Sequence, residues 1–119
     1  MEIKSNTIRE VLFSNEFTAY FENLDEKTRD KYAYIIEIIK TQYVVSEKFV
    51  KKLIGTELYE LRISLGTNEY RTILIAVDNA NFMQAKRIVL LNSFLKKDTK
   101  QYKREIDRAI KIIQTLVRE

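Results

Sequence analysis

The sequence predicts an α+β fold, in which an N-terminal helical hairpin packs on a small antiparallel β-sheet and a C-terminal helix closes the domain. Apolar residues recur at the helical spacing of three and four before residue 44 and after residue 99, and they alternate between residues 57 and 65. At 119 residues and 45% hydrophobic content, the chain can bury a core without disulfides. We therefore expect residues 1–119 to form a single domain.

Two helices are predicted near the N-terminus, after a short mixed run over residues 8–13 that is compatible with a strand. Ser14 or Asn15 can cap the first helix, and Asp25 can cap the second. Their apolar faces consist of Phe17, Tyr20, Phe21 and Leu24, followed by Tyr32, Ile35, Ile36, Ile39 and Tyr43. Because very few residues separate the two helices, an antiparallel hairpin is predicted.

The segment before the sheet is predicted to be a short third helix, which Ser46 caps and Gly55 ends. Three apolar residues at helical spacing would face inward from it, namely Phe49, Val50 and Leu53.

The sheet is predicted from three later segments. Residues 57–65 alternate between apolar and polar side chains, as a half-buried strand does, and residues 70–77 are apolar on both faces, as in a central strand. A four-residue loop over 66–69 would join them as a hairpin. Residues 87–94 predict a third strand, and a last helix begins at about Thr99.

The composition narrows the possible chemistry. The chain has no Cys and no His, which excludes disulfides, a Cys-based zinc site and a Cys nucleophile, and removes the usual acid/base residue and commonest metal ligand. We predict neither a metal nor a cofactor. No apolar run approaches the roughly 20 residues that cross a bilayer, and the N-terminus shows no apolar signal core, so a cytoplasmic protein without membrane contact is expected.

The positive charge is concentrated at the C-terminal end of the chain. Residues 86–119 contain 10 Lys and Arg against 4 Asp and Glu, whereas residues 1–85 contain 11 against 13. This asymmetry indicates a polyanionic partner such as RNA. The alternative is that these cations only keep a terminal helix in contact with water.

Two arginines are predicted to lie on one face of the sheet. If Leu65 pairs with Tyr70, Arg62 and Arg71 are diagonal neighbours that share a face with Glu60. Two guanidinium groups so close together repel unless an anion lies between them, and a phosphate suits them because each can bind it through two N–H groups. Glu60 is the other anion that could neutralise one of them.

Further cations can complete a basic site around the two arginines. Lys96 and Lys97 leave the sheet where the third strand ends, and the pair Lys51 and Lys52 precedes the first strand. RNA cleavage by its own 2′-hydroxyl requires cations on the phosphate, a proton acceptor and a proton donor, and no metal. Without His, the acceptor could be a crowded Lys, a Tyr or Glu60.

The ordered pieces of the second half resemble the RelE/HigB toxin superfamily, in particular its phage-derived, HigB-like branch. The pieces that carry the resemblance are Lys52-Leu53, Leu58 to Arg62, Tyr70-Arg71, Leu90 to Lys97, Glu105-Ile106 and Ala109. The resemblance implies the toxin of a type II toxin–antitoxin system, a ribosome-dependent endoribonuclease that cuts mRNA in the A site. It also implies a cognate helix-turn-helix antitoxin encoded next to the toxin.

The resemblance also implies roles for individual residues. Arg62 and Arg71 match the phosphate-binding arginines, and Lys96 and Lys97 match the basic pair at the strand end; these four are the catalytic candidates. Tyr102 falls where some members place a C-terminal Tyr or His. The RNA-binding candidates are Lys51, Lys52, Lys100, Tyr102, Lys103 and Arg104. Several HigB-type members use histidines that this chain lacks, so the acid and the base stay open.

Two other functions fit the same residues. The first is a catalytically silent module that binds RNA or the ribosome on the same fold, which the absence of His favours. The second is a small structural partner protein whose basic face docks an acidic chain. The two arginines on one face favour an RNA-binding function over the structural one.

Overall fold

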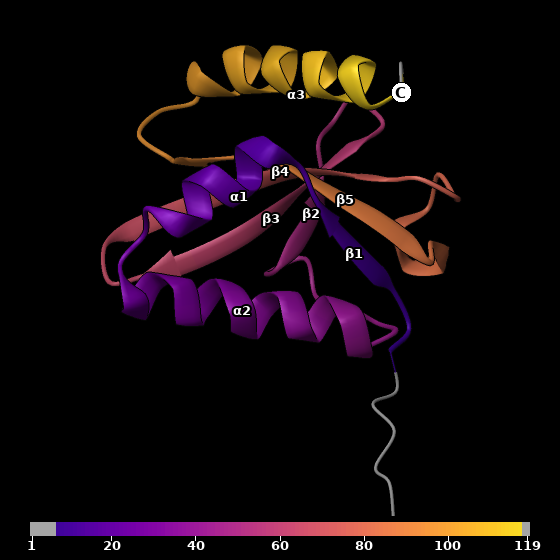
Figure 1. The fold of residues 1–119 in the computed structure, drawn as a ribbon, viewed down its shortest axis with the longest axis horizontal. Coiled ribbons are helices and arrows are strands. Elements are labelled where there is room, and N and C mark those ends of the chain that lie inside the picture. Colours follow the sequence, from indigo (N-terminus) through magenta and orange to yellow (C-terminus); the bar gives the residue numbers. More distant parts are fainter. Residues whose placement is uncertain (1–6, 118–119) are drawn as a thin grey trace, which may run out of the picture.

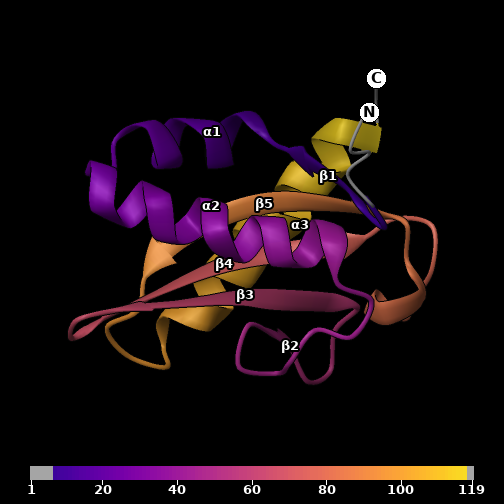
Figure 2. The same cartoon turned by 90° about the horizontal axis from the view of Figure 1, so that it is seen from below.

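The computed structural model describes residues 7–117, in which three helices pack on a five-stranded sheet. The strands are β1 (Glu10–Phe13), β2 (Val50–Lys52), β3 (Leu58–Leu65), β4 (Asn68–Ala76) and β5 (Arg87–Leu95), in the spatial order β1-β5-β4-β3-β2. The helices are α1 (Asn15–Glu22), α2 (Glu26–Thr41) and α3 (Gln101–Val117), with a 3₁₀ turn η1 (Phe82–Gln84). Helix α3 covers one face of the sheet and α2 the other (Figures 1 and 2), and the predicted α+β class is confirmed.

The N-terminal helical hairpin forms where the sequence predicts it. The Ser14 hydroxyl accepts a hydrogen bond from Phe17 N at 3.0 Å and caps α1, and the Asp25 carboxylate accepts one from Thr28 N at 3.0 Å and caps α2. Helix α2 ends at Thr41, so Tyr43, which the periodicity includes in the helix, lies beyond its end and is half exposed.

Strands β3 to β5 form the predicted antiparallel sheet, β2 adds a further antiparallel strand beside β3, and β1 adds a parallel strand at the other edge beside β5. Residues 10–13 of β1 pair with residues 87–90, and the chain then turns into α1, where Ser14 N donates to Leu90 O at 3.0 Å. Strand β4 is the third of five strands, which confirms its predicted central position.

The predicted third helix is wrong, because Val50–Lys52 form the edge strand β2. Ser46 does close a turn, since Phe49 N and Val50 N both donate to its carbonyl oxygen, but the chain then extends and Val50 pairs with Leu61. Val50 and Leu53 are buried, and a spacing of three is compatible with either structure. Gly55 has a φ of +80° in the turn before β3 and ends no helix.

The predicted four-residue hairpin loop is also wrong. Leu65 pairs with Asn68, so that only Gly66 and Thr67 join β3 to β4. Gly66 has a φ of +62°, and Thr67 has no positive φ, as in a type II′ turn with glycine at the first central position. The shorter loop shifts the register by two residues relative to the prediction.

Each face of the sheet has its own hydrophobic core. The core beneath α1 and α2 includes Phe17, Tyr32, Ile35, Ile39, Leu61, Ile63, Leu74 and Leu90. The core beneath α3 is smaller and consists of Leu53, Leu58, Ile73, Leu91, Phe94, Ala109 and Ile112. The α3 face therefore has less apolar material, and its polar residues lie toward the β3–β4 turn.

Arg9 connects three parts of the chain from a fully buried position. Its guanidinium lies 4.6 Å from the centre of the Phe82 ring. It donates, over 2.7–3.3 Å, to five main-chain carbonyl oxygens, those of Ile39, Gln42, Tyr43, Phe82 and Met83. The end of α2, the turn η1 and the start of β1 are thus held by one side chain.

Among residues 7–117, no helix is both long and apolar enough to cross a membrane.

Candidate functional site

The two arginines singled out in the sequence face each other across the β3–β4 hairpin. Arg62 pairs directly with Arg71, whereas the predicted register made them diagonal neighbours. Glu60 pairs with Ile73, a residue of the core beneath α3, so all of these side chains are on the face that α3 covers. The correct register brings the two cations closer together than the predicted register did.

The Glu60 carboxylate lies between the arginines. Its Oε1 is 3.4 Å from Arg71 Nε, and its Oε2 is 3.8 Å from Arg62 Nε. Arg71 also approaches Glu69, with 3.4 Å between Nη1 and Oε1, and donates to the Tyr70 carbonyl oxygen at 3.0 Å. Glu60 therefore offsets the repulsion between two guanidinium groups, as one of the two anions considered from the sequence.

The two arginines differ in exposure. The Arg71 side chain is 2% exposed, and the Arg62 side chain is 32% exposed. Only Arg62 therefore presents its guanidinium substantially to solvent, while Arg71 lies behind it in contact with Glu60, Glu69 and Tyr102. This difference in exposure depends on how α3 packs over the sheet, which the sequence pattern does not show.

Tyr102, in the first turn of α3, joins this cluster from above the sheet. Its hydroxyl donates to Glu60 Oε1 at 2.6 Å and accepts from Arg71 Nε at 3.2 Å. Its ring packs edge-on against Phe94, with 5.6 Å between ring centres. Burial, followed by the hydrogen bond and the negative charge of Glu60, raises the pKa of Tyr102 to about 12, with Arg71 opposing. Arg62, Arg71, Glu60 and Tyr102 are called the arginine cluster below.

The raised pKa of Tyr102 predicts an alkaline effect on stability. An unfolded tyrosine loses its proton near pH 10 and folded Tyr102 near pH 12, so its contribution is full below about pH 10 and falls as the pH rises toward 12. We expect Tyr102→Phe to lose less stability than the parent across this window. The urea unfolding midpoints of both proteins at about pH 9 and about pH 11.5 measure this loss of stability. Tyr34→Phe, which removes the hydroxyl of an exposed tyrosine, should behave like the parent. Equal losses of stability in all three proteins would contradict the assignment.

Lys96 and Lys97 lie beside the arginine cluster at the end of β5. Lys96 N donates to the Glu69 carbonyl oxygen at 2.7 Å, which places this segment next to the β3–β4 turn. Lys97 N donates to Gln101 Oε1 at 2.5 Å, and Gln101 N donates to Asp98 Oδ1 at 3.2 Å. The last two contacts cap α3 and fix the segment that leads into Tyr102.

The two lysines of β2 are on opposite faces of the sheet. Lys51 pairs with Glu60 and so shares the face of the arginine cluster. Lys52 pairs with Tyr59 on the other face, where its Nζ lies 5.1 Å from the centre of the Tyr59 ring. The structure therefore brings Lys51 to the candidate site and separates Lys52 from it.

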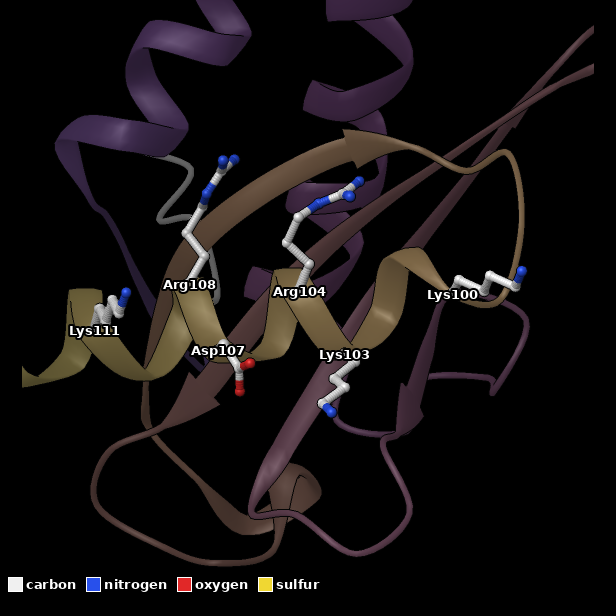
Figure 3. A pocket seen from close by; sticks show the side chains of 6 residues that line it. All are labelled: Lys100, Lys103, Arg104, Asp107, Arg108 and Lys111. Atoms are coloured by element: carbon white, nitrogen blue, oxygen red, sulfur yellow. The ribbon is translucent and has the colours of Figure 1, made fainter.

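Helix α3 carries a basic surface along its outer side. Figure 3 shows the basic side chains along α3, and those of Arg104 and Arg108 extend to the same side of the helix. Both arginines pair with the buried Glu105, at 4.0 Å and 3.6 Å. A shallow cavity of about 490 Å³ is lined by Lys100, Lys103, Arg104, Asp107, Arg108 and Lys111, which we call the α3 basic surface. Arg108 and Lys111 are also predicted from the sequence to lie on the outer faces of this helix, because of their helical spacing from Arg104, although the RNA-binding candidates end at Arg104.

No group of three or more Asp or Glu side chains within residues 7–117 is arranged to hold a metal ion. The arrangement of the arginine cluster instead suits an anionic group that guanidinium nitrogens bind directly.

A protein-family model matches most of this chain. The model described as phage-derived protein Gp49-like matches residues 19–114. The chain belongs to the phage-derived Gp49-like family. This is a RelE/HigB-like toxin family, and the match confirms the superfamily indicated by the sequence.

Solved structures show the same fold. This Gp49-like chain is similar to a chain in the crystal structure of the intact E. coli RelBE toxin–antitoxin complex, with a TM-score of 0.52 and 13% identity over 74% of this chain and 96% of that one. It is also similar to the isolated E. coli RelE toxin, with a TM-score of 0.52 and 14% identity over 82% and 95% of the two chains. No curated protein matches the chain. At these identities the structural likeness concerns the fold.

Proposed function

We propose that this Gp49-like protein is the toxin of a type II toxin–antitoxin system and that it cuts mRNA on the ribosome. The observation that carries the proposal is the arginine cluster on a RelE-like fold, where Arg62 and Arg71 face each other beside the basic end of β5. The partly exposed guanidinium of Arg62, with the buried Arg71 behind it, suits a phosphate diester. The family supports the same conclusion.

The cations would divide the work according to their exposure. Arg62, 32% exposed, contacts the phosphate as negative charge develops on it, and Lys96 and Lys97 approach from the end of β5. Arg71, 2% exposed, holds Glu60 and Tyr102 in place from behind. The reaction is an attack of the RNA 2′-hydroxyl on the adjacent phosphate, for which side chains can supply every role without a metal.

The α3 basic surface would hold the RNA or the ribosome. Lys103 and Arg104 are exposed on α3, and Lys100 is exposed in the turn before it, so each contributes a phosphate contact that depends on salt and not on sequence. Lys51 extends this surface on the side of β2, whereas Lys52, on the other face, does not. The proposed place of action is the cytoplasm.

A cognate antitoxin is part of the proposal. The related E. coli toxin crystallises in a complex with its antitoxin. An uncovered surface with five cations and one carboxylate would bind nucleic acid indiscriminately. We propose that a helix-turn-helix antitoxin, encoded next to this protein, covers the arginine cluster or the α3 basic surface.

One observation favours a second function, a catalytically silent module that binds RNA or the ribosome. The Glu60 carboxylate occupies the space between the arginines, so a phosphate at that position would have to compete with it. If Glu60 stays in place, the cluster would be structural, and the α3 basic surface alone would bind RNA.

Expression in a bacterial host separates the two functions. We expect the unaltered protein to arrest growth and to produce mRNA 5′ ends in register with codons, and co-expression of the neighbouring antitoxin to restore growth. Arg62→Ala should relieve the arrest, because it removes the one arginine of the cluster that is exposed enough to contact a phosphate, with 32% of its side chain in solvent. Growth curves and 5′-end mapping are the measurements. Normal growth with intact mRNA, at protein levels visible on a gel, would leave only the silent module.

A further inference from the structure

Two groups of the arginine cluster can take part in accepting the 2′-hydroxyl proton, the carboxylate of Glu60, which is 6% exposed, and the hydroxyl of Tyr102. Tyr102 is a neutral phenol at neutral pH, because its pKa is raised to about 12. A neutral phenol can take up a proton only if it releases its own at the same time. Its own proton already points at an acceptor, since the hydroxyl donates to Glu60 Oε1 at 2.6 Å.

Glu60 is held in place by side chains from three elements of the fold. It is 6% exposed on β3, and its carboxylate contacts Arg62 on the same strand, Arg71 on β4 and Tyr102 on α3. Lys51 on β2 pairs opposite it, and Glu69 on β4 is the other carboxylate near Arg71. The hydrogen bond to Glu60 Oε1 fixes the direction of the Tyr102 hydroxyl.

Arg71 determines the geometry on the other side of the phenol. Its Nε donates to Tyr102 Oη at 3.2 Å and lies 3.4 Å from the same Glu60 oxygen. The phenol oxygen thus has one proton directed at Glu60 and one lone pair used by Arg71. Its second lone pair is the place where a substrate hydroxyl can donate.

We propose that Tyr102 and Glu60 form a proton relay that activates the RNA 2′-hydroxyl. The inference rests on the proposed endoribonuclease function. As the 2′ oxygen bonds to phosphorus and the bond from phosphorus to the 5′ oxygen breaks, the 2′-hydroxyl proton passes to Tyr102 Oη and the Tyr102 proton passes to Glu60 Oε1. The departing 5′ oxygen takes a proton from water, and the products are a 2′,3′-cyclic phosphate and a 5′-hydroxyl. Glu60 later returns its proton to water.

Two substitutions interrupt the relay at different atoms. Tyr102→Phe removes the hydroxyl and leaves every charge of the cluster in place, and Glu60→Gln keeps the shape and removes the proton acceptor. Glu57→Gln is the matched control, because it neutralises an exposed carboxylate next to β3 and outside the cluster. The double variant Glu60→Gln with Tyr102→Phe tests whether the two groups act together.

Single-turnover mRNA cleavage on programmed ribosomes is the measurement, at several ribosome concentrations. We expect each single variant to lower the saturating rate by about 10²-fold or more, with half-saturation changed by less than about threefold. The double variant should be no more than about threefold slower than the slower single variant, because a broken relay cannot be broken again. Glu57→Gln should cleave like the parent.

Three results would overturn the relay. Parent-like cleavage by Tyr102→Phe would do so even if Glu60→Gln failed to fold. Multiplicative losses in the double variant would show that the two groups act separately. Absence of cleavage by the unaltered protein would overturn the relay together with the proposed function, whereas cleavage by the parent with unaffected variants would overturn the relay alone.

Discussion

Arg71→Lys is expected to lower the saturating rate of mRNA cleavage by roughly 10²- to 10³-fold, with a much smaller effect on ribosome binding. The lysine keeps a positive charge next to the buried Glu60, so that carboxylate is not left unpaired. A single ammonium group cannot reproduce the Nε contacts with Tyr102 and Glu60 together with the Nη1 contacts with Tyr70 and Glu69. Tyr102 therefore loses its orientation, and the transition state loses a preorganised partner.

Lys103→Ala on the α3 basic surface provides the comparison. Lys103 is exposed, so its removal should weaken ribosome binding and leave cleavage at saturation unchanged. The slope of the logarithm of the binding constant against the logarithm of the salt concentration should become shallower by about 0.7–0.9. Single-turnover cleavage and binding at two salt concentrations distinguish the two profiles. If Arg71→Lys and Lys103→Ala behaved alike, the basic residues would form one diffuse binding surface and the site would lie elsewhere.

Arg9→Met is expected to destabilise the fold by about 3–5 kcal/mol, a large part of the stability of a domain of this size. Arg9 is fully buried and donates to five carbonyl oxygens from the end of α2, Tyr43 and η1. Methionine fills much of the volume but leaves these buried and partly buried acceptors without their donor. Burial lowers the pKa of Arg9 from its ordinary value, which shows that the carbonyl oxygens must offset a desolvation cost.

Arg87→Met is the matched control, on the strand beside β1. Arg87 is 66% exposed and pairs with the exposed Glu10 at 3.4 Å, so its loss should change stability by less than about 1 kcal/mol. Urea unfolding followed by circular dichroism measures both variants under the same conditions. Similar midpoints for Arg9→Met and the parent would show that solvent reaches these carbonyl oxygens.

Local patterns predicted most of the secondary structure because neighbouring residues determine it. The capping residues Ser14 and Asp25 mark the starts of two helices, and the alternation of 57–65 marks β3. The wrong prediction of a helix at β2 also comes from relying on neighbouring residues alone. Three residues with Val50 buried fit one turn of helix as well as a short strand, and only pairing with β3 selects the strand.

The sequence by itself determined the α+β class, the family resemblance, the basic C-terminal third and the identity of the two arginines, because each is carried by residue type and spacing along the chain. Only the tertiary structure decided how these residues meet. The two-residue turn set the register that opposes Arg62 to Arg71, and the position of α3 buried Arg71 and brought Tyr102 onto Glu60. The same packing made Arg9 a buried connection between three segments. Contacts between residues tens of positions apart depend on how helices and strands pack, and no local pattern encodes them.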